Sequence, residues 1–242
     1  MSYDSSLDRG STPHALYRGD ARTIDAGLRQ YMLRVYNFMA AGLGLTGLVA
    51  YAAVASGLYQ QITGTPVIWV VMLAPLAVVL LLSFRIERMS VGAAQASFWG
   101  YAALMGLSLA GVFLIYTGTS IARVFFISAA TFAAMSLYGY TTRRDLSRFG
   151  SFLFMGLIGI VLASLVNVFI GSSALQFAVS VIGVIVFTGL TAWDTQRIKE
   201  IYLESDPGDV LTKKALMGAL TLYLDFINLF VMLLQLTGQR RE

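Results

Sequence analysis

Long unbroken apolar segments constrain this chain more than any other feature. Each of seven segments can cross a hydrocarbon core of about 30 Å as a helix rising about 1.5 Å per residue. The chain is 57% hydrophobic and 12% charged, outside the range of soluble domains. We therefore predict an all-α integral membrane protein, a bundle of seven transmembrane helices surrounded by lipid. The predicted spans are Val35–Gly57, Pro66–Phe84, Val91–Tyr116, Ile121–Tyr140, Phe149–Ile170, Leu175–Trp193 and Ala215–Leu236.

The basic residues predict the orientation of the bundle. They gather in the N-terminal region and in every second connection, around Arg85–Arg88, Arg143–Arg148 and Arg197–Lys214, and are absent from the three alternate connections. The positive-inside rule then places the N-terminus in the cytoplasm. The same distribution explains the net charge of +4, so we expect no nucleic-acid partner.

The chain divides into four parts. Residues 1–21 are predicted to form a flexible polar tail. In residues 22–34, Ile24, Leu28 and Tyr31 fall on one helical face, which predicts either a short interfacial amphipathic helix or an extension of the first span. Residues 35–237 form the predicted membrane domain, and residues 238–242 form a short C-terminal tail.

Small residues predict where helices approach each other closely. Ala102, Gly106 and Ala110 repeat every four residues in the third span, and Ala40 and Gly44 do so in the first. This spacing lets helix backbones approach in lipid. We expect both faces to pack against a neighbouring helix.

Two acidic residues are the candidate functional groups. Asp225 is the one charged residue inside Ala215–Leu236, and an acid at that depth should face protein or water and mark a function. Thr221 and Asn228 share its helical face. Asp194 follows the sixth span, with Thr191 on its own face.

The sequence leaves open whether the two acids meet. Asp194 is expected near the membrane surface, whereas Asp225 lies roughly 15 Å into its span. If they meet, we expect one shared proton and weak calcium binding at most, because two carboxylates are too few for a tight calcium cage. If they do not, we expect Asp194 to pair with Arg197 or Lys199 and a neutral Asp225 to bond Asn228 or a tyrosine.

Arg85 and Arg88 follow the second span at the predicted cytoplasmic end. Either could pair with an ionised Asp194 and release it on protonation; the alternative is that both are ordinary topology charges. The sequence has no HExxH, Walker, GxSxG or intramembrane Ser–Lys pattern, no cysteine and one histidine. We therefore expect no enzyme activity, no cofactor and no histidine or cysteine metal site.

The strings TAWDTQRIKEIY and LYLDFINLFVMLLQLTG, which hold Asp194 and Asp225, resemble the Bax inhibitor-1 family (transmembrane Bax inhibitor motif proteins), particularly its bacterial branch. The resemblance extends from about Leu28 and includes the FRxxR turn. It implies a hydrogen-bonded, pH-sensing Asp194–Asp225 pair and an arginine latch on Asp194, with Arg85 the first choice and Arg88 the second.

The resemblance also implies a function. It implies a pH-sensitive calcium leak channel of a bacterial inner membrane, opened by protonation of the pair. The alternative is a non-transporting regulator that binds a membrane-anchored ATP-dependent protease or another membrane partner. Two departures from the family pattern are an apparent extra turn at Ser205–Asp209 and a second span without an acid. The second departure weakens the case for calcium coordination within the pore.

Overall fold

The computed structural model describes residues 13–241, with side chains described from residue 26 onward. This part of the chain is helical and contains no strand, only one isolated β-bridge. The elements are α1 (Pro13–Ala55), α2 (Leu58–Thr63), α3 (Val67–Arg85), the 3-10 turn η1 (Ile86–Arg88), α4 (Val91–Leu109), α5 (Val112–Ile115), α6 (Gly118–Thr141), α7 (Ser147–Ile170), α8 (Ser173–Glu200) and α9 (Gly208–Thr237).

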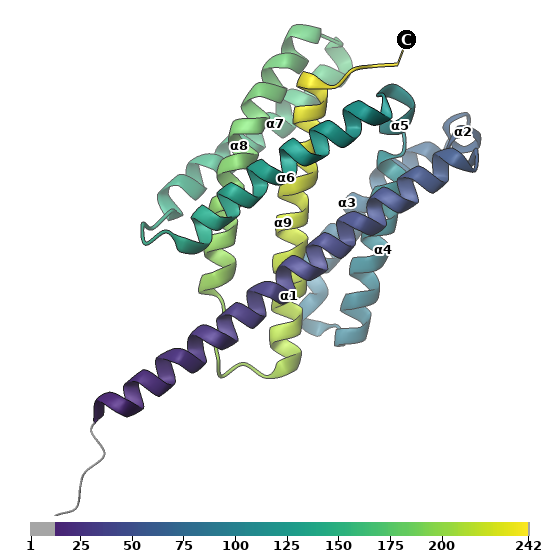
Figure 1. Cartoon of the computed structure of the whole chain (residues 1–242). Coiled ribbons are helices and arrows are strands. Elements are labelled where there is room, and N and C mark those ends of the chain that lie inside the picture. The colour runs from purple at the N-terminus through teal and green to yellow at the C-terminus, as the bar shows by residue number, and fades with distance from the viewer. Residues whose placement is uncertain (1–12, 242) are drawn as a thin grey trace, which may run out of the picture.

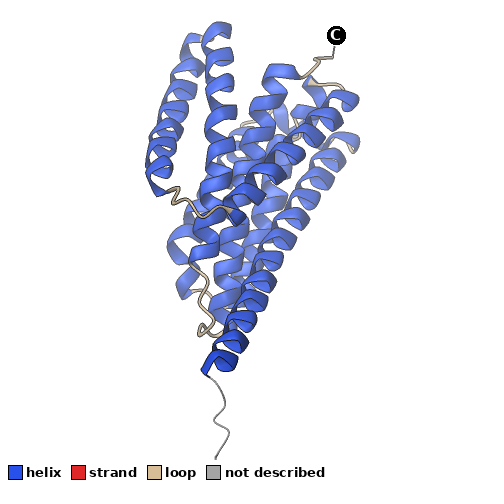
Figure 2. Cartoon of the chain, turned by 60° about the vertical axis from the view of Figure 1, so that its left-hand side comes forward, coloured by secondary structure: helices blue, strands red, loops and turns tan. Residues whose placement is uncertain are grey.

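Seven helical segments of the described chain are long and apolar enough to cross a membrane, which confirms the predicted fold class. Figure 2 shows them as one bundle joined by short loops. The segments are Ala26–Ala55, Val67–Arg88, Val91–Ile115, Gly118–Thr141, Ser147–Ile170, Ser173–Glu200 and Gly208–Thr237. The first span begins earlier than predicted, α8 runs on past Trp193, and α9 begins before Ala215.

The connections that carry the basic residues meet at one end of the bundle. Lys213 Nζ donates to the Glu87 carbonyl (3.1 Å), which joins the α8–α9 side of this end to the α3–α4 connection. Lys199 Nζ donates to the Tyr140 carbonyl (2.9 Å) at the end of α6. We call this region the basic end. No feature of the bundle assigns it to a side of the membrane, so the cytoplasmic N-terminus stays a prediction.

The N-terminal region is helical from Pro13, so α1 begins inside the predicted tail; residues 1–12 lie outside the described part. Residues 22–34 are continuous with the first span, which corresponds to the extension rather than a separate interfacial helix. Figure 1 shows α1 projecting beyond the other helices at the basic end. At the opposite end, the Arg241 amide donates to the Ile115 carbonyl (2.9 Å), so the last described residues pack on the turn after α5.

Helix α9 is the centre of the bundle. It packs against α1, α4, α6 and α8 and runs through the middle of Figure 1. Of its most apolar 18-residue stretch, 61% is buried inside the protein, against 6% for the corresponding stretch of α7. The helix that carries Asp225 is therefore the one most shielded from lipid, as an intramembrane acid requires.

The small residues of the third span pack as predicted. Ala102, Gly106 and Ala110 are buried, and α4 packs against α1. A Cβ atom built on Gly106 would lie 2.5 Å from the Thr46 carbonyl oxygen and 2.9 Å from Val49 Cβ. The two backbones are therefore as close as glycine allows, which confirms the packing face on this span.

The prediction for the first span is wrong. Ala40 and Gly44 are exposed, and Gly44 has no neighbour within 4 Å of an added Cβ atom. The buried face is instead Gly42, Thr46 and Ala50, two residues out of register. Both sets have four-residue spacing, so spacing alone cannot choose between them. The buried hydroxyl of Thr46, which bonds to neighbouring helices, decides the choice.

Candidate functional site

The two acids meet inside the bundle. Asp194 of α8 is 7% exposed and Asp225 of α9 is 5% exposed. Their carboxyl groups lie within hydrogen-bonding reach of each other. Oδ2 of Asp225 is buried and finds no hydrogen-bond donor among the described groups. A proton shared with Asp194 would satisfy it, and two carboxyl groups can hydrogen-bond only when at least one carries a proton.

The register of α8 against α9 brings the acids together. The helices run antiparallel, and the Ser180 hydroxyl donates to Gln235 Oε1 (2.7 Å) on one side of the pair. On the other side Ile198 packs on Gly218, where an added Cβ atom would lie 2.9 Å from Ile198 Cγ2. Because α8 continues six residues past Asp194 to Glu200, that acid lies roughly 9 Å inside the helix end. Helix α9 begins ten residues before Gly218, whereas α8 ends two residues after Ile198, so α9 extends past the end of α8 and the two acids come level.

The neighbouring polar side chains of the predicted stripes bond to their own helices. The hydroxyl groups of Thr191 and Thr221 donate to the backbone carbonyls four residues earlier, at 2.8 and 3.1 Å. The Asn228 amide likewise donates to the Leu224 carbonyl (2.8 Å). None of the three donates to the acid pair, so a supporting role for them stays a prediction.

The candidate latch residues lie away from the pair. Arg85 ends α3 and Arg88 lies in η1; both are exposed, and neither bonds to Asp194 or Asp225. The basic side chain that acts on Asp194 is Arg197, whose guanidinium lies 5.5 Å from the centroid of the Trp193 ring. Within residues 26–241, one ion pair is formed, between Lys214 and Asp206 (2.5 Å). A latch at Arg85 or Arg88 stays a prediction.

A chain of hydroxyl groups beside the pair was not predicted. Thr195, next to Asp194 in sequence, lies 3.0 Å from the Ser136 hydroxyl of α6, which lies 2.7 Å from the Tyr36 hydroxyl of α1. The chain ties three helices together next to the site. A sequence signal for it exists, because α6 carries buried serines every eight residues, at Ser120, Ser128 and Ser136.

A second polar contact lies on α9 two residues before Asp225. The Tyr223 hydroxyl lies 2.7 Å from Thr46 Oγ1 of α1, which also donates to the Ala102 carbonyl of α4 (2.9 Å). The rings of Tyr223 and Tyr101 pack edge to face, 5.5 Å apart. Asp225 is thus held on a helix fixed against α1, α4 and α8.

The acid pair is a poor fit for a tight metal site. In the part of the chain with described side chains, no three His, Cys, Asp or Glu side chains come together. Calcium takes six to eight oxygen ligands, and two carboxyl groups supply four at most. The weak calcium site predicted at Asp194 and Asp225 stays a prediction.

Comparisons with known proteins match almost the whole chain. The sequence model of a family described as "Inhibitor of apoptosis-promoting Bax1" matches residues 28–242. A protein of Rickettsia prowazekii is 51% identical over 222 residues, covering 91% of this chain and 94% of its own length. The inner membrane protein YbhL of Escherichia coli is 51% identical over 220 residues, covering 89% and 94%. A protein of Caulobacter vibrioides is 45% identical over 232 residues, covering 91% and 92%.

Proposed function

Because the chain belongs to the Bax inhibitor-1 family of membrane proteins, we propose that it is a pH-sensitive calcium leak gated by protonation of the Asp194–Asp225 pair. The observation that carries the proposal is the pair itself, two buried carboxyl groups within hydrogen-bonding reach. We further propose a bacterial inner membrane as its location, because YbhL is named an inner membrane protein.

Electrostatics makes the pair a switch. Two negative charges about 4 Å apart repel each other by about 4 kcal/mol at an effective dielectric constant of 20, and burial adds the cost of removing both from water. The pair therefore holds a shared proton or recruits a cation. A change of protonation changes the charge at the contact between α8 and α9, since one acid lies on each helix.

The seam between α8 and α9 is closed on both sides of the pair. On the basic side, Ile198 is 4% exposed and fills the space above Gly218. On the other side, Met232 packs on Gly183, where an added Cβ atom would lie 2.9 Å from Met232 Cγ. We assign this arrangement to the closed state. Opening requires α8 to move away from α9, so that Ile198 leaves Gly218.

Protonation opens this seam in our proposal. An ionised Asp194 attracts cationic side chains of the basic end, with Arg197 on its own helix and Arg85 or Arg88 as the latch from the second span. A proton on Asp194 removes the attraction to the latch arginine of the second span and so frees α8 to move, whereas Arg197 lies on α8 itself and moves with it. Because two carboxyl groups hold calcium weakly, the ion passes rather than being stored. Transport is then passive and follows the calcium gradient.

The direct test measures calcium release from vesicles that contain the purified protein, between pH 6 and pH 8. Wild-type flux should rise as the pH falls. Asp194→Asn and Asp225→Asn should each give a flux that no longer depends on pH, because an amide cannot exchange the proton. Asp209→Asn is the matched control, since this acid is exposed in the first turn of α9. Ile198→Ala should raise the flux at pH 8.

The outcomes separate the two candidate functions. An unchanged pH profile in both Asp194→Asn and Asp225→Asn would refute gating by the pair. Wild-type vesicles that release no calcium at any pH would refute the leak and favour the non-transporting regulator, the alternative that the family resemblance implies.

A further inference from the structure

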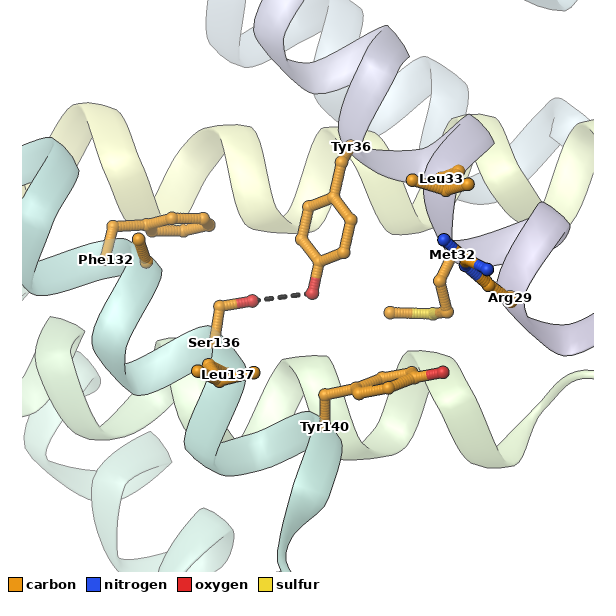
Figure 3. Close-up of a pocket in the computed structure, with 9 residues that line it drawn as sticks. Arg29, Met32, Leu33, Tyr36, Phe132, Ser136, Leu137 and Tyr140 are labelled. Atoms are coloured by element: carbon orange, nitrogen blue, oxygen red, sulfur yellow. Dashed lines mark hydrogen bonds between the residues drawn. The ribbon is translucent and has the colours of Figure 1, made fainter. Parts of the chain in front are cut away.

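A groove separates α1 from α6 near the basic end (Figure 3). Its volume is about 540 Å³, within the range of ligand sites, and it is lined by four residues of α1 and five of α6. Both helices pack on α9 behind the groove. The lining residues belong to membrane-spanning segments. A lipid beside the bundle can therefore reach the groove from the side.

The groove is polar at one end and apolar at the other. Figure 3 shows the guanidinium group of Arg29 and the phenol of Tyr140 at one end and the ring of Phe132 at the other. Phe132 lies eight residues before Tyr140 on α6, which is about 12 Å along the helix. Met32 and Leu137 add apolar surface between them. An occupant of matching chemistry has an apolar chain and a polar head at the basic end.

The charge at the mouth favours an anionic head. None of the residues that line the groove is acidic, and Arg29 is exposed there. A second cation lies behind Tyr140, because Lys199 Nζ is 5.9 Å from the centroid of that ring. Basic pockets between transmembrane helices bind anionic lipid head groups. A zwitterionic head group would gain less, because its own ammonium group offsets the charge of its phosphate.

The floor of the groove can accept a hydrocarbon chain without leaving a polar group unpaired. Its two hydroxyl groups, on Tyr36 and Ser136, bond to each other at 2.7 Å, as Figure 3 shows. A buried hydroxyl group without a partner would cost about 1–3 kcal/mol in a protein interior. This cost is avoided here, so the apolar surface around the two hydroxyl groups determines what binds.

We propose that this groove binds one anionic phospholipid from the leaflet at the basic end. One acyl chain lies between α1 and α6, and the phosphate contacts Arg29. The site goes beyond the proposed function, because it depends on neither the acid pair nor ion conduction.

Native mass spectrometry of the delipidated protein in detergent tests the proposal. The probes are phosphatidylglycerol and phosphatidylcholine with identical acyl chains. Wild type should prefer phosphatidylglycerol, and Arg29→Gln should weaken its binding about fivefold, the loss expected for one basic residue at an anionic lipid. Phosphatidylcholine should lose less, because its choline ammonium offsets the charge of the phosphate that contacts Arg29. Arg29→Lys should keep most of the preference. The matched control is Arg148→Gln, an exposed arginine near the start of α7.

A second variant tests the acyl chain. Ala133 is exposed toward the groove, and the Ala133→Trp side chain should fill the groove and remove high-affinity binding of both lipids. The elution volume and unfolding temperature of this variant check that it is folded. If it unfolds, Leu137→Trp takes its place. Equal binding of the two lipids to wild type would overturn the proposal, as would an Arg29→Gln variant indistinguishable from Arg148→Gln. Unchanged lipid binding in a folded groove-filling variant would overturn the placement of the chain.

Discussion

Thr46→Val should loosen the junction of three helices. Thr46 is 4% exposed, and its hydroxyl contacts the Ala102 carbonyl of α4 (2.9 Å), the Tyr223 hydroxyl of α9 (2.7 Å) and the Gly42 carbonyl of its own helix (2.9 Å). Valine keeps the shape of threonine and removes the hydroxyl group. Its effect on stability therefore reports the hydrogen bonds rather than a cavity.

The structure places the stability loss expected for Thr46→Val near the upper limit for hydrogen bonds between transmembrane helices. Hydrogen bonds between transmembrane helices contribute about 0.6 kcal/mol on average and about 1.7 at most. A buried group that loses its partner costs about 1–3 kcal/mol in soluble proteins. Tyr223 is fully buried, and its hydroxyl has Thr46 as its hydrogen-bond partner. We expect Thr46→Val to lower the free energy of unfolding by about 1.5 kcal/mol.

A double-mutant cycle with Tyr223→Phe isolates the contact. Unfolding by sodium dodecyl sulfate in mixed micelles is measured for wild type, both single variants and the double variant. The double variant should be about 1 kcal/mol more stable than the sum of the single losses predicts. Thr237→Val is the control, because that exposed hydroxyl donates to the Leu233 carbonyl of its own helix (2.8 Å), and it should stay within about 0.5 kcal/mol. Additivity within about 0.3 kcal/mol would refute the argument.

Two further substitutions test the packing around α8. Gly139→Ala would place a methyl group against the Ala192 carbonyl, so α6 and α8 must separate and the unfolding temperature should fall; Gly159→Ala, with no neighbour within 4 Å, should leave it unchanged. Gln196→Leu removes an amide that bonds at 2.8 and 2.9 Å to the backbone of the α6–α7 connection. Amide hydrogen exchange there should become faster, and an unchanged rate would contradict the pinning role of this side chain.

The end of α8 illustrates what the sequence could and could not predict. Hydropathy ends the sixth span at Trp193, because polar residues follow. The helix nevertheless continues to Glu200, since those polar groups find partners in the fold: Thr195 contacts Ser136 of α6, and Lys199 bonds to the last turn of α6. Hydropathy treats a polar side chain as exposed, and only the tertiary structure supplies the partners that allow its burial.

The acid pair could be predicted from the sequence more readily than the latch, for a similar reason. An acid within an apolar helix has few acceptable surroundings, so Asp225 could be singled out from the sequence, and packing of α8 on α9 supplied its partner. An arginine in a connection has many acceptable positions, because its long side chain can reach water in most of them. The exposed positions of Arg85 and Arg88 therefore could not be derived from their spacing.

The central position of α9 has a consequence for biogenesis. Because α9 follows the other described helices in the chain, the ribosome makes the core of the bundle last. Until α9 enters the membrane, Asp194 lacks its partner acid and Thr46 lacks Tyr223. The six earlier spans can still pack on one another, α1 and α3 on α4 and α6 and α7 on α8, but these polar groups stay unmatched. A chain interrupted before Gly208 would remain in that state, and its unmatched polar groups would distinguish it from the finished protein for membrane quality control.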